Sequence, residues 1–134
     1  MFEEAIEQLQ DDRFVLGAFD KDQIIGICGF VSIKTQTNAG LRNIGSLIQL
    51  YGKPDYRGMG IGLHLVDYLI EEGFQIPGVG HIVLEVTEDN QPAIRIYEQA
   101  GFVSYDPVFL PGKQSTPGSL RMVHNGISNS SKKF

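Results

Sequence analysis

The stretch "YRGMGIGLHLV" (residues 56–66) places three glycines within five positions, directly before an apolar pattern with helical spacing. Glycine adopts backbone conformations that other residues avoid, and it lets a ligand approach the main chain closely. The first turn of a helix adds unpaired amide hydrogens and a partial positive charge, so a glycine-rich turn at this point can bind an anion. Arg57 could add charge-assisted hydrogen bonds to a phosphate. The alternative interpretation is a tight strand-to-helix connection with an incidental arginine.

The spacing of these residues excludes two common phosphate-binding motifs. A P-loop ends in Gly-Lys-Ser or Gly-Lys-Thr, whereas this turn ends in "GLH" (62–64). A dinucleotide-binding fingerprint counted from Gly58 would need a glycine where Leu63 stands. The pattern that is present is Arg-x-x-Gly-x-Gly, which begins at Arg57.

The rest of the chain predicts a single mixed α/β domain over residues 1–126, followed by a disordered tail over 127–134. Apolar residues at helical spacing predict a first helix over 2–10, and "TQTNAGLRN" (35–43) is typical of a loop. A second helix should follow the glycine-rich turn. A third should begin at Asp89 or Asn90 and end at Gly101. Strands are predicted over 13–19, 23–33, 44–51, 81–86, 102–110 and 119–124.

Two motifs carry a resemblance to a known family. "LYGKPDYRGMGIG" (50–62) resembles motif A of the GNAT superfamily of acyl-CoA-dependent N-acetyltransferases, and "LEVTEDNQPAIRIYEQAGF" (84–102) resembles its motif B. They occur in the family's order, and the likeness covers about residues 10–124. It implies an α/β fold with a mixed, mainly antiparallel central sheet flanked by helices. Family domains open with a strand and a long helix, which this chain is expected to lack, so that it would start in the last part of the following helix.

The resemblance also implies a site for acetyl-CoA. In the family the amides of motif A bind the pyrophosphate, and the preceding strand bulges and splays so that its free backbone groups pair with pantetheine. Family members often carry an aliphatic residue where Gly52 stands, which leaves the acyl group less defined. Asn90 is expected to contact the cofactor arm, to cap its helix, or both. The implied cofactor-binding residues are Leu50, Tyr51, Gly52, Arg57, Gly58, Met59, Gly60, Ile61, Gly62, Asn90, Ala93 and Tyr97.

Two catalytic residues are implied in the same way. Tyr97 matches the motif B tyrosine that protonates the departing thiolate, and a phenol suits this task because its pKa is close to that of an alkyl thiol. The alternative for Tyr97 is a packing role beside Ile94 and Phe102. Glu85 matches a glutamate that some members use as general base, and an inward position would raise its pKa. The alternative for Glu85 is an outward-facing or structural carboxylate.

Composition and net charge limit the classes of partner that we expect the protein to bind. The formal net charge of −5 argues against nucleic acid and weakly favours cationic small molecules or basic peptides. The single cysteine, Cys28, indicates a reducing compartment, and neither a signal peptide nor a membrane-spanning apolar run is visible, so we expect a cytoplasmic protein. The three histidines are scattered, which predicts no metal site.

The resemblance implies an N-acetyltransferase that moves an acetyl group from acetyl-CoA to a primary amine by direct attack in a ternary complex. The alternative is an acyl-CoA-binding module with little or no catalysis that serves regulation or assembly. The acceptor amine stays open. A homodimer would cover the sheet edge that a missing first strand exposes.

Overall fold

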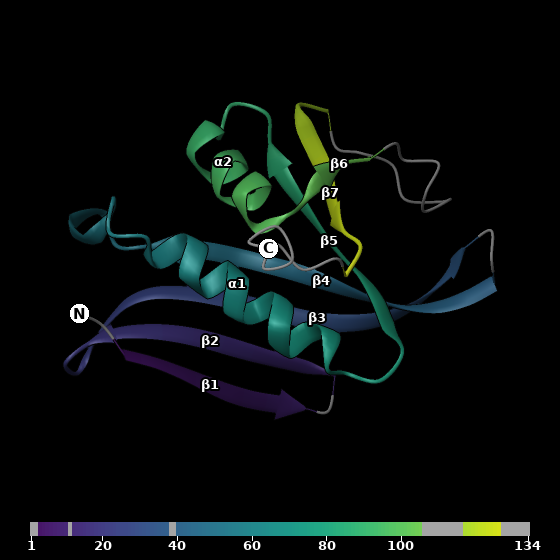
Figure 1. Cartoon of the computed structure of the whole chain (residues 1–134), viewed down its shortest axis with the longest axis horizontal. Helices are drawn as coiled ribbons and strands as arrows, with labels where there is room; N and C mark the ends of the chain where they lie inside the picture. The colour runs from purple at the N-terminus through teal and green to yellow at the C-terminus, as the bar shows by residue number, and fades with distance from the viewer. Residues whose placement is uncertain (1–2, 11, 38–39, 106–116, 127–134) are drawn as a thin grey trace, which may run out of the picture.

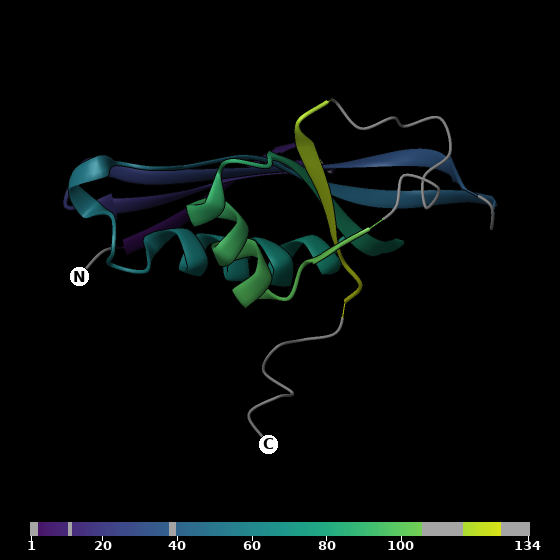
Figure 2. The same ribbon diagram turned by 90° about the horizontal axis from the view of Figure 1, so that it is seen from above.

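The computed structural model describes residues 3–10, 12–37, 40–105 and 117–126. These residues form one seven-stranded sheet and two α-helices, and Figures 1 and 2 show both helices on the same face of the sheet. The elements, in chain order, are β1 (Glu3–Gln10), β2 (Arg13–Asp20), β3 (Gln23–Thr37), β4 (Gly40–Gly52), the 3₁₀ turn η1 (Pro54–Tyr56), α1 (Ile61–Phe74), β5 (Val79–Thr87), α2 (Gln91–Ala100), β6 (Val103–Ser104) and β7 (Ser119–His124).

The strand order is β1-β2-β3-β4-β5-β7-β6, and β4 with β5 is the parallel pair in an otherwise antiparallel sheet. This arrangement confirms the predicted fold class. The connection from β4 to β5 passes through α1, as a parallel crossover requires. That topology places the glycine-rich turn at the end of β4, where the chain leaves the sheet and enters α1.

The helix predicted over residues 2–10 is wrong, and so is the expectation that the chain enters the domain from a helix. Residues Glu3–Gln10 form β1, which pairs antiparallel with β2 from Glu3 opposite Phe19 to Gln10 opposite Arg13. Ile6 lies opposite Leu16, so pairing with a neighbouring strand overrides the short helical spacing of the apolar residues. The sheet edge beside β2 is therefore occupied by this chain itself.

The loop predicted over residues 35–43 is also wrong in its extent. β3 continues to Thr37 and β4 begins at Gly40, with cross-strand pairs from Ile33 opposite Ile44 to Thr37 opposite Gly40. A two-stranded ribbon exposes both faces to water, so polar side chains are compatible with strand structure there.

In the predicted strand 102–110, β6 covers Val103–Ser104, and residues 106–110 lie outside the described residues, as does the predicted tail 127–134.

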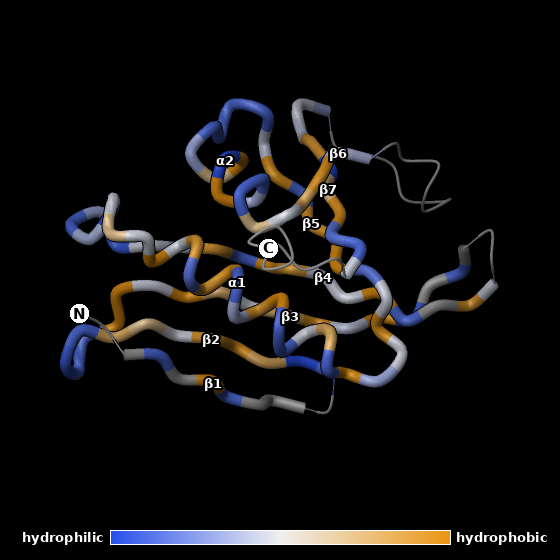
Figure 3. The backbone as a smooth tube through the Cα atoms, viewed as in Figure 1, coloured by the Kyte–Doolittle hydropathy of each residue, from blue (hydrophilic) through white to orange (hydrophobic). Residues whose placement is uncertain are grey.

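The hydrophobic core lies between the sheet and the two helices. Leu65, Val66 and Leu69 of α1 are fully buried, and Phe14 of β2 stacks on Phe30 of β3 with ring centroids 4.8 Å apart. Figure 3 shows hydrophobic residues along β2 and β3 and at intervals along α1. Full burial of one such side chain contributes about 1.5–3 kcal/mol, so this layer holds α1 and its N-terminal turn against the sheet.

The opposite face of the sheet, which we call the helix-free face, carries no helix among the described residues. Its residues alternate with the buried ones along each strand. Large apolar side chains on it are exposed, including Ile48 at 47% and Tyr51 at 55%. The two faces thus differ in their cover: one is packed against α1 and α2, and the other presents these exposed side chains, although it also buries Ile44 and Val123.

Candidate functional site

A gap in the middle of the sheet organises the site. β4 and β5 pair only from Asn43 opposite Val79 to Ser46 opposite Val83. Beyond this point the residues 47–52 of β4 and 84–87 of β5 keep their outer partners, β3 and β7, but no longer pair with each other. Backbone donors and acceptors therefore line both sides of the gap, and such groups need a partner when they are removed from water.

A β-bulge lies in β4 where this gap opens. Cys28 pairs with Leu50 and Gly29 pairs with Ile48, so Gln49 is the extra residue. Gln49 has a φ of +61°, which is uncommon for a residue other than glycine. A bulge bends its strand and re-aims the following residues. Here the bulge lies three residues beyond Ser46, the last β4 residue that pairs with β5, and it re-aims Leu50, Tyr51 and Gly52.

The glycine-rich turn connects the end of β4 to α1. Gly58 and Gly60 have φ values of +85° and +81°, and Gly60 is the N-terminal cap of α1. No side chain caps this helix, and the first α1 amide with a backbone partner is His64, which donates to the Gly60 carbonyl. The amides of residues 58–63 thus have no backbone partner among the described residues and lie at the positive end of the helix dipole. Residues 57–60 are exposed to water, whereas Ile61 is buried.

The glycines in and around this turn are explained by different structural constraints. A Cβ on Gly58, Gly60 or Gly52 would meet no atom within 4 Å. Gly58 and Gly60 are therefore explained by their left-handed backbone conformation rather than by lack of space. Gly52 lies in open space. A Cβ on Gly62 would lie 2.9 Å from the Cδ1 atom of Ile96. Gly62 therefore serves close packing of α1 against α2, which keeps the two helices side by side next to the gap.

Tyr97 projects from α2 into the core on the helix side of the sheet. It is 5% exposed, and its ring meets that of Phe102 edge-on at 5.9 Å. Burial, with a smaller contribution from Cys28, raises the pKa of Tyr97 to about 12. Within the described part of the chain its hydroxyl has no hydrogen-bond partner, yet it is not fully buried. Because Cys28 pairs with Leu50, Tyr97 lies near the bulge in β4.

Asn90 caps the N-terminus of α2. Its side-chain oxygen accepts a hydrogen bond of 3.3 Å from the amide of Ala93, and Gly101 ends the helix in a left-handed conformation with a φ of +108°. The predicted capping role of Asn90 and the predicted helix end are both observed. Asn90 and Ala93 start the same helix that carries Tyr97, so α2 presents all three residues from one rigid element.

Glu85 lies on the other face of the sheet from Tyr97. Its neighbours Leu84 and Val86 point into the core, and Glu85 itself is exposed. Its carboxylate is paired with Arg121 of β7, with Oε2 and Nε 3.4 Å apart. The inward position considered from the sequence is therefore not the observed one. Tyr51 likewise points to the helix-free face, where it is 55% exposed.

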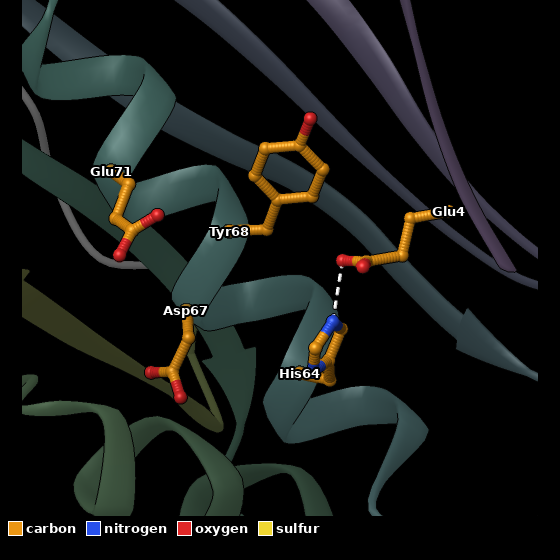
Figure 4. A pocket seen from close by; sticks show the side chains of 5 residues that line it. All are labelled: Glu4, His64, Asp67, Tyr68 and Glu71. Carbon is orange, nitrogen blue, oxygen red and sulfur yellow. Dashed lines mark ion pairs between the residues drawn. The ribbon is translucent and has the colours of Figure 1, made fainter. Parts of the chain in front are cut away.

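A separate hollow of about 460 Å³ lies between β1 and α1, away from the predicted site residues (Figure 4). Its lining is Glu4, His64, Asp67, Tyr68 and Glu71. The Nε2 atom of His64 lies 2.5 Å from Oε2 of Glu4, which ties the edge strand to α1.

No group of three or more ligand-type side chains among the described residues could hold a metal ion. No helix in the described ranges has the length and apolar character needed to cross a membrane.

Two residues of the site escaped the sequence reasoning. Gln49 carries no signal in the sequence, because a bulge is visible only in the register of two strands. Arg121 stands in the strand "SLRMVH" (119–124), and its position opposite Glu85 follows from the pairing of β5 with β7. Leu50 and Gly52 lie on β4 beyond its last pair with β5, residues 57–62 form the turn into α1, and α2 carries Asn90, Ala93 and Tyr97. Glu85 and Tyr51 face the helix-free side.

Comparison with known proteins supplies the context for this arrangement. A family model described as "Acetyltransferase (GNAT) family" matches residues 1–102. Acetyltransferase PseH of Campylobacter jejuni is 32% identical over 88 residues, which are 66% of this chain and 50% of that protein. N-alpha-acetyltransferase 30 of Schizosaccharomyces pombe is 31% identical over 97 residues, which are 72% of this chain and 62% of that protein. The chain thus spans about half to three fifths of the length of these curated relatives.

Solved structures share the fold. Arabidopsis thaliana NAA60 in complex with acetyl-CoA superposes with a TM-score of 0.68 at 19% identity, covering 84% of this chain and 76% of that one. At this level of identity the likeness establishes the arrangement of strands and helices. It places the gap and the glycine-rich turn in a sheet of the same architecture.

Proposed function

The chain belongs to the acetyltransferase (GNAT) family, and from this premise we propose that it binds acetyl-CoA in the gap between β4 and β5 and transfers the acetyl group to a primary amine. The amine attacks the thioester directly, with both substrates bound at once. The divergence of the two strands after Ser46 and Val83 is the observation that carries this proposal. It leaves backbone groups of β4 and β5 unpaired, close to the glycine-rich turn that follows β4 and to the buried Tyr97.

The pantetheine arm is proposed to bind as an added strand along β4. Residues Leu50–Gly52 have their β5-side backbone groups unpaired, and an extended ligand with amides can satisfy them as a neighbouring strand would. The pyrophosphate then lies at the amides of residues 58–62, where the helix dipole and Arg57 favour negative charge. Asn90 and Ala93 at the start of α2 form the opposite wall.

Tyr97 is proposed as the acid that protonates the leaving thiolate. The raised pKa keeps its hydroxyl protonated throughout the physiological range, as a proton donor requires. Its hydroxyl is not fully buried and has no competing partner among the described residues, so it is available to a ligand in the gap. An acid of this kind contributes about 10²–10⁴-fold to the rate of comparable reactions.

Glu85 is proposed as the base that takes a proton from the acceptor ammonium. Extending the β4–β5 register by two residues from Ser46 and Val83 brings Glu85 level with Ile48, at the mouth of the gap on the helix-free face. The acceptor then approaches from the open face while Tyr97 acts from the helix side. The ammonium loses two protons, the C–N bond forms, the C–S bond breaks, and the thiolate gains one proton, so that one proton is released overall.

The test combines binding and turnover on the intact chain. Isothermal titration should show saturable binding of acetyl-CoA in preference to ATP and NAD. A thiol-release assay with polyamines, amino acids, aminoglycosides and peptide N-termini should show transfer to at least one of these amines. Binding without release to any amine would support the acyl-CoA-binding module instead. Absence of acetyl-CoA binding would contradict both functions.

A further inference from the structure

Glu85 and Arg121 form an ion pair that differs in exposure between its two partners. They are cross-strand neighbours on β5 and β7, with Nε of Arg121 3.4 Å from Oε2 of Glu85. The side chain of Arg121 is 11% exposed and that of Glu85 is 40% exposed. A cation that is withdrawn from water depends strongly on its carboxylate partner, because separating the two leaves a buried charge uncompensated. The buried guanidinium of Arg121 therefore holds the exposed carboxylate of Glu85 in place.

Arg121 is itself fixed by its surroundings. Its carbonyl accepts a hydrogen bond of 3.1 Å from the amide of Tyr105, which follows β6. Its side chain is also hydrogen-bonded to the Tyr105 hydroxyl, whose pKa is raised chiefly by burial and, less strongly, by the Glu85 charge. The strand ladder and Tyr105 thus leave the guanidinium little freedom to leave Glu85.

We propose that Arg121 is a positioning residue that holds the Glu85 carboxylate at the mouth of the gap, where it meets the acceptor ammonium. This inference rests on the proposed function of the gap. Ionisable groups that share this side of the sheet with Glu85 include Arg121 on β7, Tyr105 after β6, Tyr51 on β4, His81 on β5 and Arg13 on β2, with Glu88 beyond the end of β5. Arg121 is the cation paired with the Glu85 carboxylate, so its removal should free this carboxylate to move away from the mouth of the gap.

The experiment compares Arg121→Gln and Arg121→Lys, each alone and combined with Glu85→Gln. Arg13→Gln is the matched control, because Arg13 also pairs with a carboxylate, Asp12, at 3.2 Å, but both partners are 45% exposed and lie at the β1–β2 hairpin. The readouts are kcat/KM for the amine, affinity for acetyl-CoA, thermal unfolding, and the position of the Glu85 carboxylate in crystal structures of the variants.

We expect Arg121→Gln to lower kcat/KM for the amine about 10-fold or more, with acetyl-CoA affinity kept. Arg121→Lys should restore part of the loss because it restores the charge. In the Glu85→Gln background the same substitution should have little further effect, since coupled residues are not additive. Arg13→Gln should leave kcat/KM unchanged.

Two results would overturn the inference. One is a loss of kcat/KM in Arg121→Gln that only accompanies a drop in thermal stability and is not recovered in Arg121→Lys, and the other is an equal loss of kcat/KM in the presence and absence of the Glu85 carboxylate. If the wild-type chain transfers acetyl to no amine, the proposed function fails. Crystal structures of the wild type and Arg121→Gln then decide the inference alone: the Glu85 carboxylate must change its position in the variant, and an unmoved carboxylate rejects the positioning role.

Discussion

Ser46 and Val83 are the last residues that pair across the middle of the sheet, and the extra residue Gln49 follows three positions after Ser46. A parallel sheet gains one ladder hydrogen bond after another as long as its strands stay side by side. Ending that ladder early leaves backbone groups unpaired on both strands, and the bulge re-aims those of β4. A ligand with extended amides can restore the missing bonds, so this feature links the fold to the proposed cofactor site.

Substitution of Tyr97 by phenylalanine tests the proposed acid. The change removes only the hydroxyl of a residue that is 5% exposed, so the packing against Phe102 should persist. We expect kcat to fall by about 10²-fold or more while the affinity for acetyl-CoA changes little. Steady-state kinetics and calorimetry measure the two quantities. Tyr68→Phe, in the hollow between β1 and α1, is the control, and an unchanged kcat in Tyr97→Phe would remove the residue from the mechanism.

Comparison of Gly60→Ala with Gly78→Ala separates the effect of backbone strain on stability from the effect of the turn on acetyl-CoA binding. Gly60 and Gly78 have φ values of +81° and +86° and lie before and after α1, and a Cβ would find open space at Gly60 and ordinary contact at 3.6 Å at Gly78. Both substitutions should destabilise the fold by about 1–2 kcal/mol, because each forces alanine into left-handed backbone. Only Gly60→Ala should weaken acetyl-CoA binding. Equal binding by the two variants in a titration would contradict the role of the turn.

Substitutions at Gln49 test the importance of the bulge. With a φ of +61°, the position favours glycine and disfavours a β-branched residue. We expect Gln49→Gly to keep the wild-type stability within about 1 kcal/mol, because relief of strain offsets the added freedom of the unfolded chain. Gln49→Val should lose about 1–2 kcal/mol and bind acetyl-CoA more weakly. Urea unfolding and calorimetry measure both effects, and a valine variant with unaltered binding would show that the bulge is dispensable.

The buried histidine predicts a pH dependence of stability. His124 is 2% exposed and packs against the rings of Phe74 and Phe102, and burial lowers its pKa below the ordinary value, although a hydrogen bond with the Ala100 backbone acts in the opposite direction. Below a pH of about 6.5 the unfolded histidine binds a proton that the folded one resists. The free energy of unfolding should therefore fall as the pH drops below that value, and it should be constant above it.

Urea unfolding between pH 5 and pH 8 measures this dependence. The fall should be smaller in His124→Gln than in the wild type, whereas His81→Gln, which alters a partly exposed imidazole paired with Asn125, should retain it. A proton NMR titration of the His124 ring gives the same information without a variant. A wild-type slope that survives in His124→Gln would assign the effect to other groups.

Local signals in the sequence determined much of this protein. The glycines before an apolar helical run predicted the turn and α1, Asn90 predicted the start of α2, and Gly101 predicted its end. The succession of strands and helices along the chain after residue 12 was also predicted correctly, within the described residues. These features depend on residues that are close together in the chain, such as a capping oxygen and an amide three positions later. The two motifs implied the residues around the turn for the same reason.

Tertiary structure alone decided which strands pair and which side chains share a face. Residues 3–10 have helical spacing but form a strand, because β2 offers a partner whose pairing outweighs a short amphipathic pattern. Glu85 faces away from Tyr97 because its strand buries Leu84 and Val86, and a one-residue change of register would reverse this choice. The bulge at Gln49 and the end of pairing after Ser46 depend on strands that are distant in sequence. Contacts between distant strands produce no periodic pattern in the sequence of either strand. The site therefore forms only when the sheet assembles.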